Sequence, residues 1–221
     1  MIEAVLFDFN GTMFFDFEYH VEAWQSVVDE ISQGKIIFLD FFEKNYGLHN
    51  RQFIKKILEE CGIDVDDEEL VRISKLKEAR YREIVKDKKG KLAPGVEKLL
   101  DELKAKNIKR TIVSASIVEN IEFFYEYFNL SRWFEFESII YDNGMYIDKI
   151  KMYEDAANEL NTDIKRCLVF EDSLIGIHNA MIAGCDNCVF VNSTKNQSVI
   201  EDKIVQEIDN YDNFDRLILN N

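Results

Sequence analysis

The sequence predicts an α/β fold in which a parallel sheet carries helices on both faces and an all-helical segment is inserted after the first strand. Two observations predict this fold. Apolar runs short enough to be strands buried on both faces recur along the chain and alternate with segments of helical period. Between the first and second of these runs lies a long segment, residues 15–91, whose apolar positions follow a helical period. Strands that alternate with helices form parallel sheets.

The first strand is predicted at Ala4-Val5-Leu6-Phe7, and the stretch Asp8-Phe9-Asn10-Gly11-Thr12 follows it directly. A carboxylate and a glycine turn therefore stand at the carboxyl end of a buried parallel strand, where open α/β sheets bind their ligands. The same residues are also typical of an ordinary turn at the end of a strand. This stretch alone leaves both interpretations open.

The inserted segment is predicted to be an all-helical domain. In its first helix the apolar positions keep a period of about 3.6 residues, at Val21, Trp24, Val27, Val28 and Ile31. Three more helices are predicted near residues 39–46, 51–61 and 68–85, and a polar, glycine-bearing connection follows them. The predicted organisation is a discontinuous α/β core domain, residues 1–14 and 92–221, with a helical domain at residues 15–91.

The alternation of strands and helices resumes after the insertion. Helices are expected over residues 94–106, 118–128 and 152–160, and a further helix should carry Gly176, Ala180 and Gly184 on one face. Strands are expected over residues 110–113, 167–170 and 188–191, and a hairpin of residues 138–141 and 145–147 around Asn143-Gly144. The tail should add one short strand and a helix over residues 212–219. The hairpin follows from Asn-Gly, the strongest short signal for a two-residue turn.

Polar residues stand directly after three of the predicted strands: Asp8, Ser114 and the pair Glu171-Asp172. Because the carboxyl ends of parallel strands meet at one edge of the sheet, these side chains are expected to converge. Carboxylates that converge repel one another unless a cation lies among them, and oxygen ligands suit Mg²⁺, which usually keeps substrate phosphate in its shell. The set predicts a phosphoryl-transfer site with Asp8 as a carboxylate nucleophile.

Composition limits the partners and the location. The net charge of −15 argues against nucleic acid, which requires clustered Lys and Arg. No apolar run approaches the ~20 residues of a membrane span, and the N-terminus lacks the basic start of a secretory signal. Four cysteines in 221 residues, including a lone Cys185-x-x-Cys188, predict buried thiols rather than a disulfide framework. A cytoplasmic location is expected, and no protein partner is implied.

Taken in order, these motifs resemble the haloacid dehalogenase superfamily of phosphotransferases, in the subclass whose helical cap is inserted between the first two signatures of a Rossmann-like core. The resemblance covers nearly the whole chain. It includes Asp8-Phe9-Asn10-Gly11-Thr12, Ser114-Ala115-Ser116, a lysine at 149 or 151, and Glu171-Asp172-Ser173. Within the superfamily the chain is most similar to the β-phosphoglucomutase-type phosphatases and phosphomutases, because Glu18-Tyr19-His20 precedes Ala23-Trp24 as it does in them.

The resemblance implies a role for each matching residue. Asp8 would be the nucleophile, Ser114 would hydrogen-bond the transferring phosphoryl group, and Lys149, preferred to Lys151, would neutralise it. Mg²⁺ would be held by Asp8, Glu171, Asp172 and the main-chain carbonyl of Asn10. The implied substrate-binding residues are His20, Trp24, Arg51, Ala115 and Ser116.

The chain departs from the family at two positions. Asn10 replaces the second aspartate, the family's general acid and base, a function that is typically worth about 10²–10⁴-fold in rate. Ile117 stands where a lysine would be expected in a mutase. The leading hypothesis is a Mg²⁺-dependent phosphohydrolase that acts on a small phosphorylated, sugar-phosphate-like metabolite. The alternatives are a β-phosphoglucomutase, a phosphonate hydrolase that uses Lys55 or Lys56, and a protein that binds a phosphorylated ligand without turnover.

Overall fold

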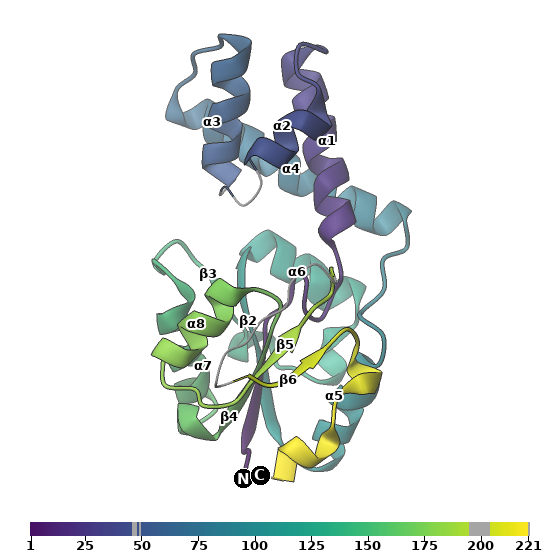
Figure 1. Ribbon diagram of the computed structural model, residues 1–221, viewed down its shortest axis with the longest axis vertical. Coiled ribbons are helices and arrows are strands. Elements are labelled where there is room, and N and C mark those ends of the chain that lie inside the picture. The colour runs from purple at the N-terminus through teal and green to yellow at the C-terminus, as the bar shows by residue number, and fades with distance from the viewer. Residues whose placement is uncertain (46–47, 49, 195–203, 221) are drawn as a thin grey trace. The chain divides into compact units, whose positions relative to one another are not determined.

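The computed structural model describes residues 1–45, 48, 50–194 and 204–220. The chain separates into two compact units (Figure 1). The larger unit combines residues 1–15 with residues 91–221, and the smaller unit consists of residues 16–90. The smaller unit is therefore an insertion between the first strand of the larger unit and the remainder of that unit.

The larger unit is built on a six-stranded sheet in the order β3-β2-β1-β4-β5-β6, and every neighbouring pair of strands is parallel. The strands are β1 (Ala4–Phe7), β2 (Lys109–Ile117), β3 (Ile140–Asp142), β4 (Cys167–Glu171), β5 (Cys188–Val191) and β6 (Ile204–Ile208). All residues of β1, β4 and β5 are buried, because helices cover both faces of the sheet. The predicted fold class is confirmed.

Helices pack on the two faces of this sheet (Figure 1), with α7 and α8 on one side and α5 and α6 on the other. They are α5 (Val96–Ala105), α6 (Val118–Tyr127), α7 (Lys149–Glu159) and α8 (Leu174–Ile182). Side chains alternate across β1, so Ala4 and Leu6 join the buried cluster under α7 and α8. Phe7 points to the opposite face, where its ring stacks on Phe170 at 5.0 Å between centroids.

The strand order reverses beside β1. The chain runs from β1 outward through β2 to β3, and then returns to β4 on the other side of β1. Phe7 is consequently paired with Ile112 of β2 and with Phe170 of β4. The carboxyl ends of these three strands lie together at the point of reversal, which is where open α/β sheets bind ligands.

The described residues of the smaller unit form four helices with a core of their own. They are α1 (Phe17–Ser32), α2 (Phe38–Asn45), α3 (Asn50–Cys61) and α4 (Asp67–Asp87). Their apolar faces bury one cluster, which includes Trp24, Phe53 and Ile73. Asp66 starts α4, because its side chain accepts a hydrogen bond from the Glu69 amide at 2.9 Å. Tyr46, the predicted end of the second helix, lies outside the described residues.

Three local predictions were wrong. Residues 140–142 do not form a hairpin: β3 pairs with β2 in parallel, and residues 145–147 form no strand, because the open edge of β2 offers β3 its partner. The helix expected from residue 152 begins at Lys149, where the Asp148 side chain accepts a hydrogen bond from the Ile150 amide at 2.9 Å. The helix expected over residues 212–219 is replaced by two short 3₁₀ turns, Tyr211–Asn213 and Arg216–Asn220.

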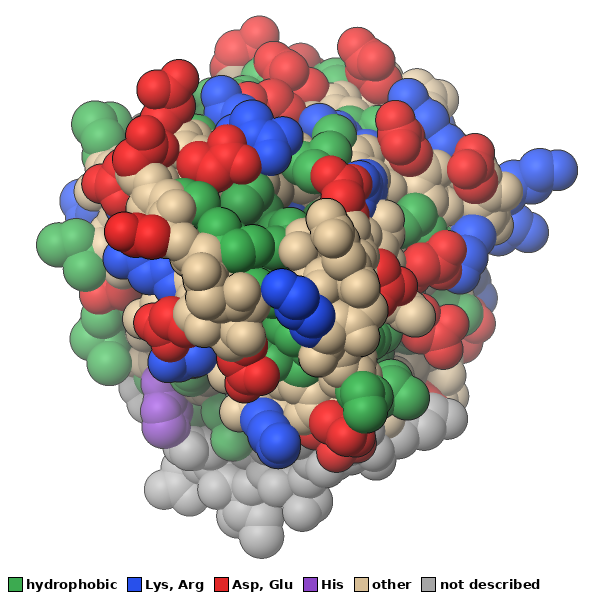
Figure 2. All heavy atoms as spheres, turned by 90° about the horizontal axis from the view of Figure 1, so that it is seen from above, with side chains coloured by type: hydrophobic (Ala, Val, Ile, Leu, Met, Phe, Trp, Pro, Cys, Tyr) green, Lys and Arg blue, Asp and Glu red, His purple; other side chains and the backbone are tan. Residues whose placement is uncertain are grey.

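The other 3₁₀ turns connect elements of the larger unit and are Leu130–Arg132, Phe136–Ser138 and Ile164–Arg166. Among the described helices, none combines the length and the apolar character that crossing a membrane demands. On the face shown in Figure 2, Lys and Arg side chains lie among Asp and Glu side chains instead of gathering in one patch.

Candidate active site

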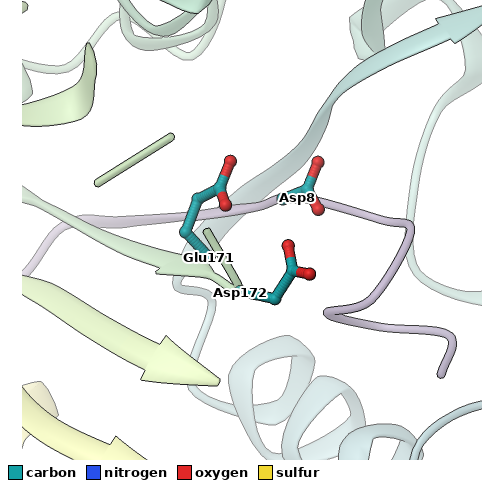
Figure 3. A group of neighbouring side chains, drawn as sticks. All are labelled: Asp8, Glu171 and Asp172. Atoms are coloured by element: carbon teal, nitrogen blue, oxygen red, sulfur yellow. The ribbon is translucent and has the colours of Figure 1, made fainter. Parts of the chain in front are cut away.

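Three carboxylates converge at the carboxyl edge of the sheet (Figure 3). Asp8 follows β1, Glu171 ends β4, and Asp172 comes next in the chain. One oxygen from each lies within 4.8 Å of the other two, and the three side chains point toward a common position. Asp8 and Glu171 are buried, whereas Asp172 is partly exposed. The edge of the sheet thus gathers negative charge, as the strand ends predict.

Lys149 supplies the positive charge at this edge. It is the first residue of α7, and its Nζ donates to Asp8 Oδ1 at 2.5 Å and to Glu171 Oε1 at 2.6 Å. Burial alone would lower the pKa of Lys149, but the two carboxylates outweigh burial and raise it. Lys151 lies on the exposed side of the helix and pairs with Glu154 and Asp155 instead. The structure therefore brings Lys149, and not Lys151, to the carboxylates.

Two side chains donate hydrogen bonds to Asp8. Lys149 binds Oδ1, and the Thr12 hydroxyl donates to Oδ2 at 3.1 Å. Burial raises the pKa of the Asp8 carboxyl to about 7, although the Lys149 ammonium opposes that rise. Thr12 was part of the predicted motif without an assigned role, and its bond to Asp8 is a contact that the sequence analysis missed.

Glu171 has both oxygens occupied. Lys149 Nζ and the Tyr153 hydroxyl, at 3.1 Å, donate to Oε1, and the amide and hydroxyl of Ser173 each donate to Oε2 at 3.0 Å. Burial would raise the pKa of Glu171, but Lys149 and Ser173 together hold it below its ordinary value. Ser173 was part of the predicted motif without an assigned role. Tyr153 was not predicted, because a tyrosine on the apolar face of a helix resembles any core residue.

Two glycines leave the space that these carboxylates occupy. A Cβ on Gly11 would lie 2.1 Å from Asp172 Oδ2, and Gly11 adopts a φ of +74°, which L side chains rarely adopt. A Cβ on Gly176, in the first turn of α8, would lie 1.9 Å from Glu171 Oε1. The small-residue face predicted for this helix therefore makes room for a carboxylate at the site.

The end of β2 contributes Ser114, Ala115 and Ser116. Ser114 is buried, and its Oγ accepts from the Ser116 amide at 3.2 Å. Ser116 Oγ donates to Asn10 Oδ1 at 2.7 Å, so the third residue of the first motif is tied to the neighbouring strand. Ala115 is exposed between the two serines. All three belong to β2, which extends to Ile117 and therefore further than the strand predicted over 110–113.

The predicted residues His20, Trp24 and Arg51 belong to the smaller unit. His20 Nε2 lies 3.1 Å from Asp16 Oδ2, and His20 Nδ1 lies 2.7 Å from Lys77 Nζ. Trp24 is only 7% exposed and packs on Phe53, with 4.5 Å between ring centroids. Arg51 forms an exposed ion pair with Asp67. All of these interactions lie within the smaller unit, so the role of the three residues in substrate binding stays a prediction.

The donor set at the sheet edge fits a hard divalent cation. Its candidate ligands are the carboxylate oxygens of Asp8, Glu171 and Asp172, which is the chemistry that Mg²⁺ prefers. Three carboxylates against one ammonium leave an excess of negative charge in a mostly buried position. The space left by Gly11 lets Asp172 approach this position.

A doubly wound sheet with a carboxylate cluster and a lysine at its reversal point is typical of proteins that bind or transfer phosphoryl groups. The model of the haloacid dehalogenase-like hydrolase family matches residues 2–180, and the chain belongs to that family. A HAD hydrolase of family IA, variant 3, from Entamoeba histolytica superposes with a TM-score of 0.88 at 30% identity, covering 99% of this chain and 97% of that chain.

Two further solved structures resemble the whole chain. The β-phosphoglucomutase of Clostridium difficile has a TM-score of 0.76 at 25% identity and covers 100% of this chain and 96% of its own. CbbY of Rhodobacter sphaeroides, in complex with phosphate, has a TM-score of 0.79 at 21% identity and covers 96% of each chain. An Asp-to-Asn variant of CbbY has also been solved in complex with xylulose 1,5-bisphosphate.

Proposed function

We propose that this protein is a Mg²⁺-dependent phosphohydrolase that acts on a small phosphorylated, sugar-phosphate-like metabolite through an aspartyl-phosphate intermediate. The convergence of Asp8, Glu171 and Asp172 around one lysine carries the proposal. Such a cluster suits phosphoryl transfer, because a cation and an ammonium together offset the charge that spreads over the transferred group. Family membership and the phosphate bound to CbbY support the same reaction class.

Each residue has a proposed role. Asp8 Oδ2 attacks phosphorus, and the Thr12 hydroxyl orients this carboxylate. The Lys149 ammonium and the Ser114 hydroxyl hold the oxygens of the transferring group. Asp8, Asp172, Glu171 and the Asn10 carbonyl would hold Mg²⁺, which when bound supplies charge neutralisation to the phosphoryl oxygens. The carboxylate of Asp8 is the leaving group when water attacks the intermediate.

We propose further that the larger unit is the catalytic core and that the four-helix unit is its cap, which would contribute His20, Trp24 and Arg51 to substrate binding. Caps of this kind exclude water and set specificity. The xylulose bisphosphate bound to the CbbY variant supports a sugar-phosphate-like substrate.

A panel of phosphate esters together with acetyl phosphate, assayed with Mg²⁺ and with excess chelator, tests the proposal. Turnover is expected only with Mg²⁺, and Asp8→Ala should abolish it. Asp29→Asn, an exposed position on α1, is the matched control and should retain the native rate. Phosphate release that Asp8→Ala leaves unchanged would exclude Asp8 as the nucleophile.

A β-phosphoglucomutase is the second candidate, favoured by the likeness to the enzyme of Clostridium difficile. Isomerisation needs a proton moved in both half-reactions, and the Asn10 amide does not carry one near neutral pH. The native chain is therefore expected not to convert β-glucose 1-phosphate to glucose 6-phosphate. Conversion by the native chain at a rate close to that of Asn10→Asp would favour the mutase.

Asn10 also favours a third candidate, a protein that binds a phosphorylated ligand without turning it over. Calorimetric binding of a panel member, with no phosphate released over hours by the native chain, would support this candidate against the hydrolase.

A further inference from the structure

We infer that the site takes phosphoryl groups from donors whose leaving group departs as a stable anion, namely acyl phosphates and phosphoanhydrides, in preference to alkyl phosphate esters. This inference rests on the proposed function and specifies the kind of bond to phosphorus that the enzyme breaks. It does not specify the carbon skeleton of the donor. The observation that carries it is the hydrogen bond between Ser116 and Asn10.

The Asn10 side chain is an amide fixed in place. The Asn10 Oδ1 atom accepts a hydrogen bond from Ser116 Oγ at 2.7 Å, so the amide oxygen faces β2. The other end of the amide, Nδ2, can only donate hydrogen bonds. Asn10 lies two residues after Asp8, at the same edge of the sheet. An amide N–H donates a hydrogen bond to a departing oxygen but does not release its proton, so it stabilises an anion without protonating it.

Three other groups at the sheet edge donate hydrogen bonds to the carboxylates. The Lys149 ammonium donates to Asp8 and Glu171. The Tyr153 hydroxyl donates to Glu171, and the Thr12 hydroxyl donates to Asp8. In the smaller unit, the imidazole of His20 is occupied by Asp16 and Lys77. Lys149, Tyr153 and Thr12 are therefore arranged to hold the charge of the carboxylates.

Transfer of the phosphoryl group to Asp8 balances without a general acid. A carboxylate oxygen of Asp8 attacks phosphorus, the bond from phosphorus to the bridging oxygen breaks, and that oxygen keeps the electron pair. A carboxylate or a phosphate leaves in this form, whereas an alkoxide needs a proton. Loss of general acid catalysis typically costs about 10²–10⁴-fold, and this cost falls on donors with basic leaving groups.

The second half-reaction lacks a base for the same reason. Water attacks the aspartyl-phosphate, the carboxylate of Asp8 departs, and the proton of the water passes to bulk solvent. Because the Asn10 amide does not take that proton during attack, this step is slow. An activated donor should therefore load Asp8 faster than water unloads it, and the phosphorylated enzyme should accumulate.

The test uses Mg²⁺-loaded full-length protein with acetyl phosphate and with glycerol 3-phosphate, for the native chain, Asn10→Asp and Asp8→Ala. Peptide mass spectrometry first verifies Asn at position 10, because Asn-Gly sequences deamidate. Asn158→Asp, exposed on α7, is the matched control for added negative charge. The readouts are phosphate release and intact mass, which reveals one added phosphoryl group.

The native chain should turn over acetyl phosphate and gain mass, and its kcat/KM for glycerol 3-phosphate, which reports the loading of Asp8, should be lower by about 10²–10⁴-fold. Asn10→Asp should raise kcat/KM for glycerol 3-phosphate by about that factor and change kcat/KM for acetyl phosphate far less, while Asn158→Asp matches the native chain. Equal kcat/KM for both donors in the native chain would overturn the inference, as would an equal gain for both donors in Asn10→Asp. If neither the native chain nor Asn10→Asp turns over or is phosphorylated by either donor, the proposed function itself fails.

Discussion

The ammonium of Lys149 lies 2.5 Å from Asp8 Oδ1, in a position where it also reaches Glu171 at 2.6 Å. One lysine thus joins the ends of β1 and β4 across the point where the strand order reverses. Because the Lys149 side chain is only 15% exposed, water screens its charge weakly. In the proposed function, this contact places Lys149 to offset the charge of a phosphoryl group on Asp8.

Substitution of Lys149 by Met should lower kcat by about 10²–10³-fold, the cost of removing one preorganised charge from such a site. Lys151→Met is the matched control and should stay within a few fold of native, because the exposed Lys151 side chain pairs with Glu154 and Asp155 and not with the carboxylates of the site. Steady-state kinetics with saturating Mg²⁺ checks both. Equal losses in the two variants would show that the lysines contribute through the net charge of α7 and not through contact.

The sequence indicates the carboxylates well and their partners poorly. Buried parallel strands are continuous apolar runs in the sequence. The polar residues at the ends of such runs, Asp8 and Glu171, can therefore be recognised from the sequence alone. Tyr153 is not, because a tyrosine within a helical apolar stripe looks like core until its hydroxyl is seen on Glu171. The bond between Ser116 and Asn10 depends on the irregular register at the end of β2, which no local pattern encodes.

At Asn143-Gly144 the sequence predicted a turn correctly but predicted a hairpin that does not form. The dipeptide does turn the chain, with Gly144 at a φ of +81° and its amide bound to Asp142 Oδ1 at 2.8 Å. The residues before it, however, find their partner in the edge of β2 rather than across a hairpin. Tertiary pairing therefore decided the strand, and local turn chemistry decided only the turn.

Tyr153→Phe should weaken Mg²⁺ binding by about tenfold, because residues that orient a metal ligand typically contribute 10–100-fold in affinity. The variant removes one of the two donors to Glu171 Oε1 and leaves the buried ring in place. Calorimetric titration with Mg²⁺ measures the effect independently of turnover. Tyr146→Phe is the control, since that hydroxyl donates to Asp155 at the far side of α7. Unchanged Mg²⁺ affinity in Tyr153→Phe would reduce its hydroxyl to a packing role.

Gly176→Ala should destabilise the protein by about 1–3 kcal/mol, the cost of leaving buried polar groups without partners. The new Cβ would lie 1.9 Å from Glu171 Oε1, and the displaced carboxylate would lose its bonds to Lys149 and Ser173. On an exposed helix the same change would stabilise, because alanine favours helix over glycine by about 1 kcal/mol. Asn179→Ala on α8 controls for helix propensity, and urea unfolding measures both. A gain in stability for Gly176→Ala would show that the carboxylate moves aside freely.

A buried lysine in the smaller unit gives a prediction on pH. Lys77 is 2% exposed, donates to Glu78 Oε1 at 2.9 Å, and lies 5.4 Å from the centroid of the Trp24 ring. Burial lowers the pKa of Lys77 below its usual 10.5, and the charges on Glu78 and Asp16 only partly oppose this. Between the lowered pKa and 10.5, the unfolded chain binds more protons at this position than the folded chain.

The free energy of unfolding should therefore rise with pH in that window for the native chain, relative to Lys77→Met, which has no group to titrate. Below the lowered pKa the difference between the two proteins should be constant. Urea unfolding at steps from about pH 7 to pH 10 measures the difference, followed by Trp24 fluorescence in a Trp133→Phe background so that the signal reports on the smaller unit. Parallel curves for the native chain and Lys77→Met across the whole range would mean that folding does not shift the titration of Lys77, and that Glu78 fully compensates for its burial.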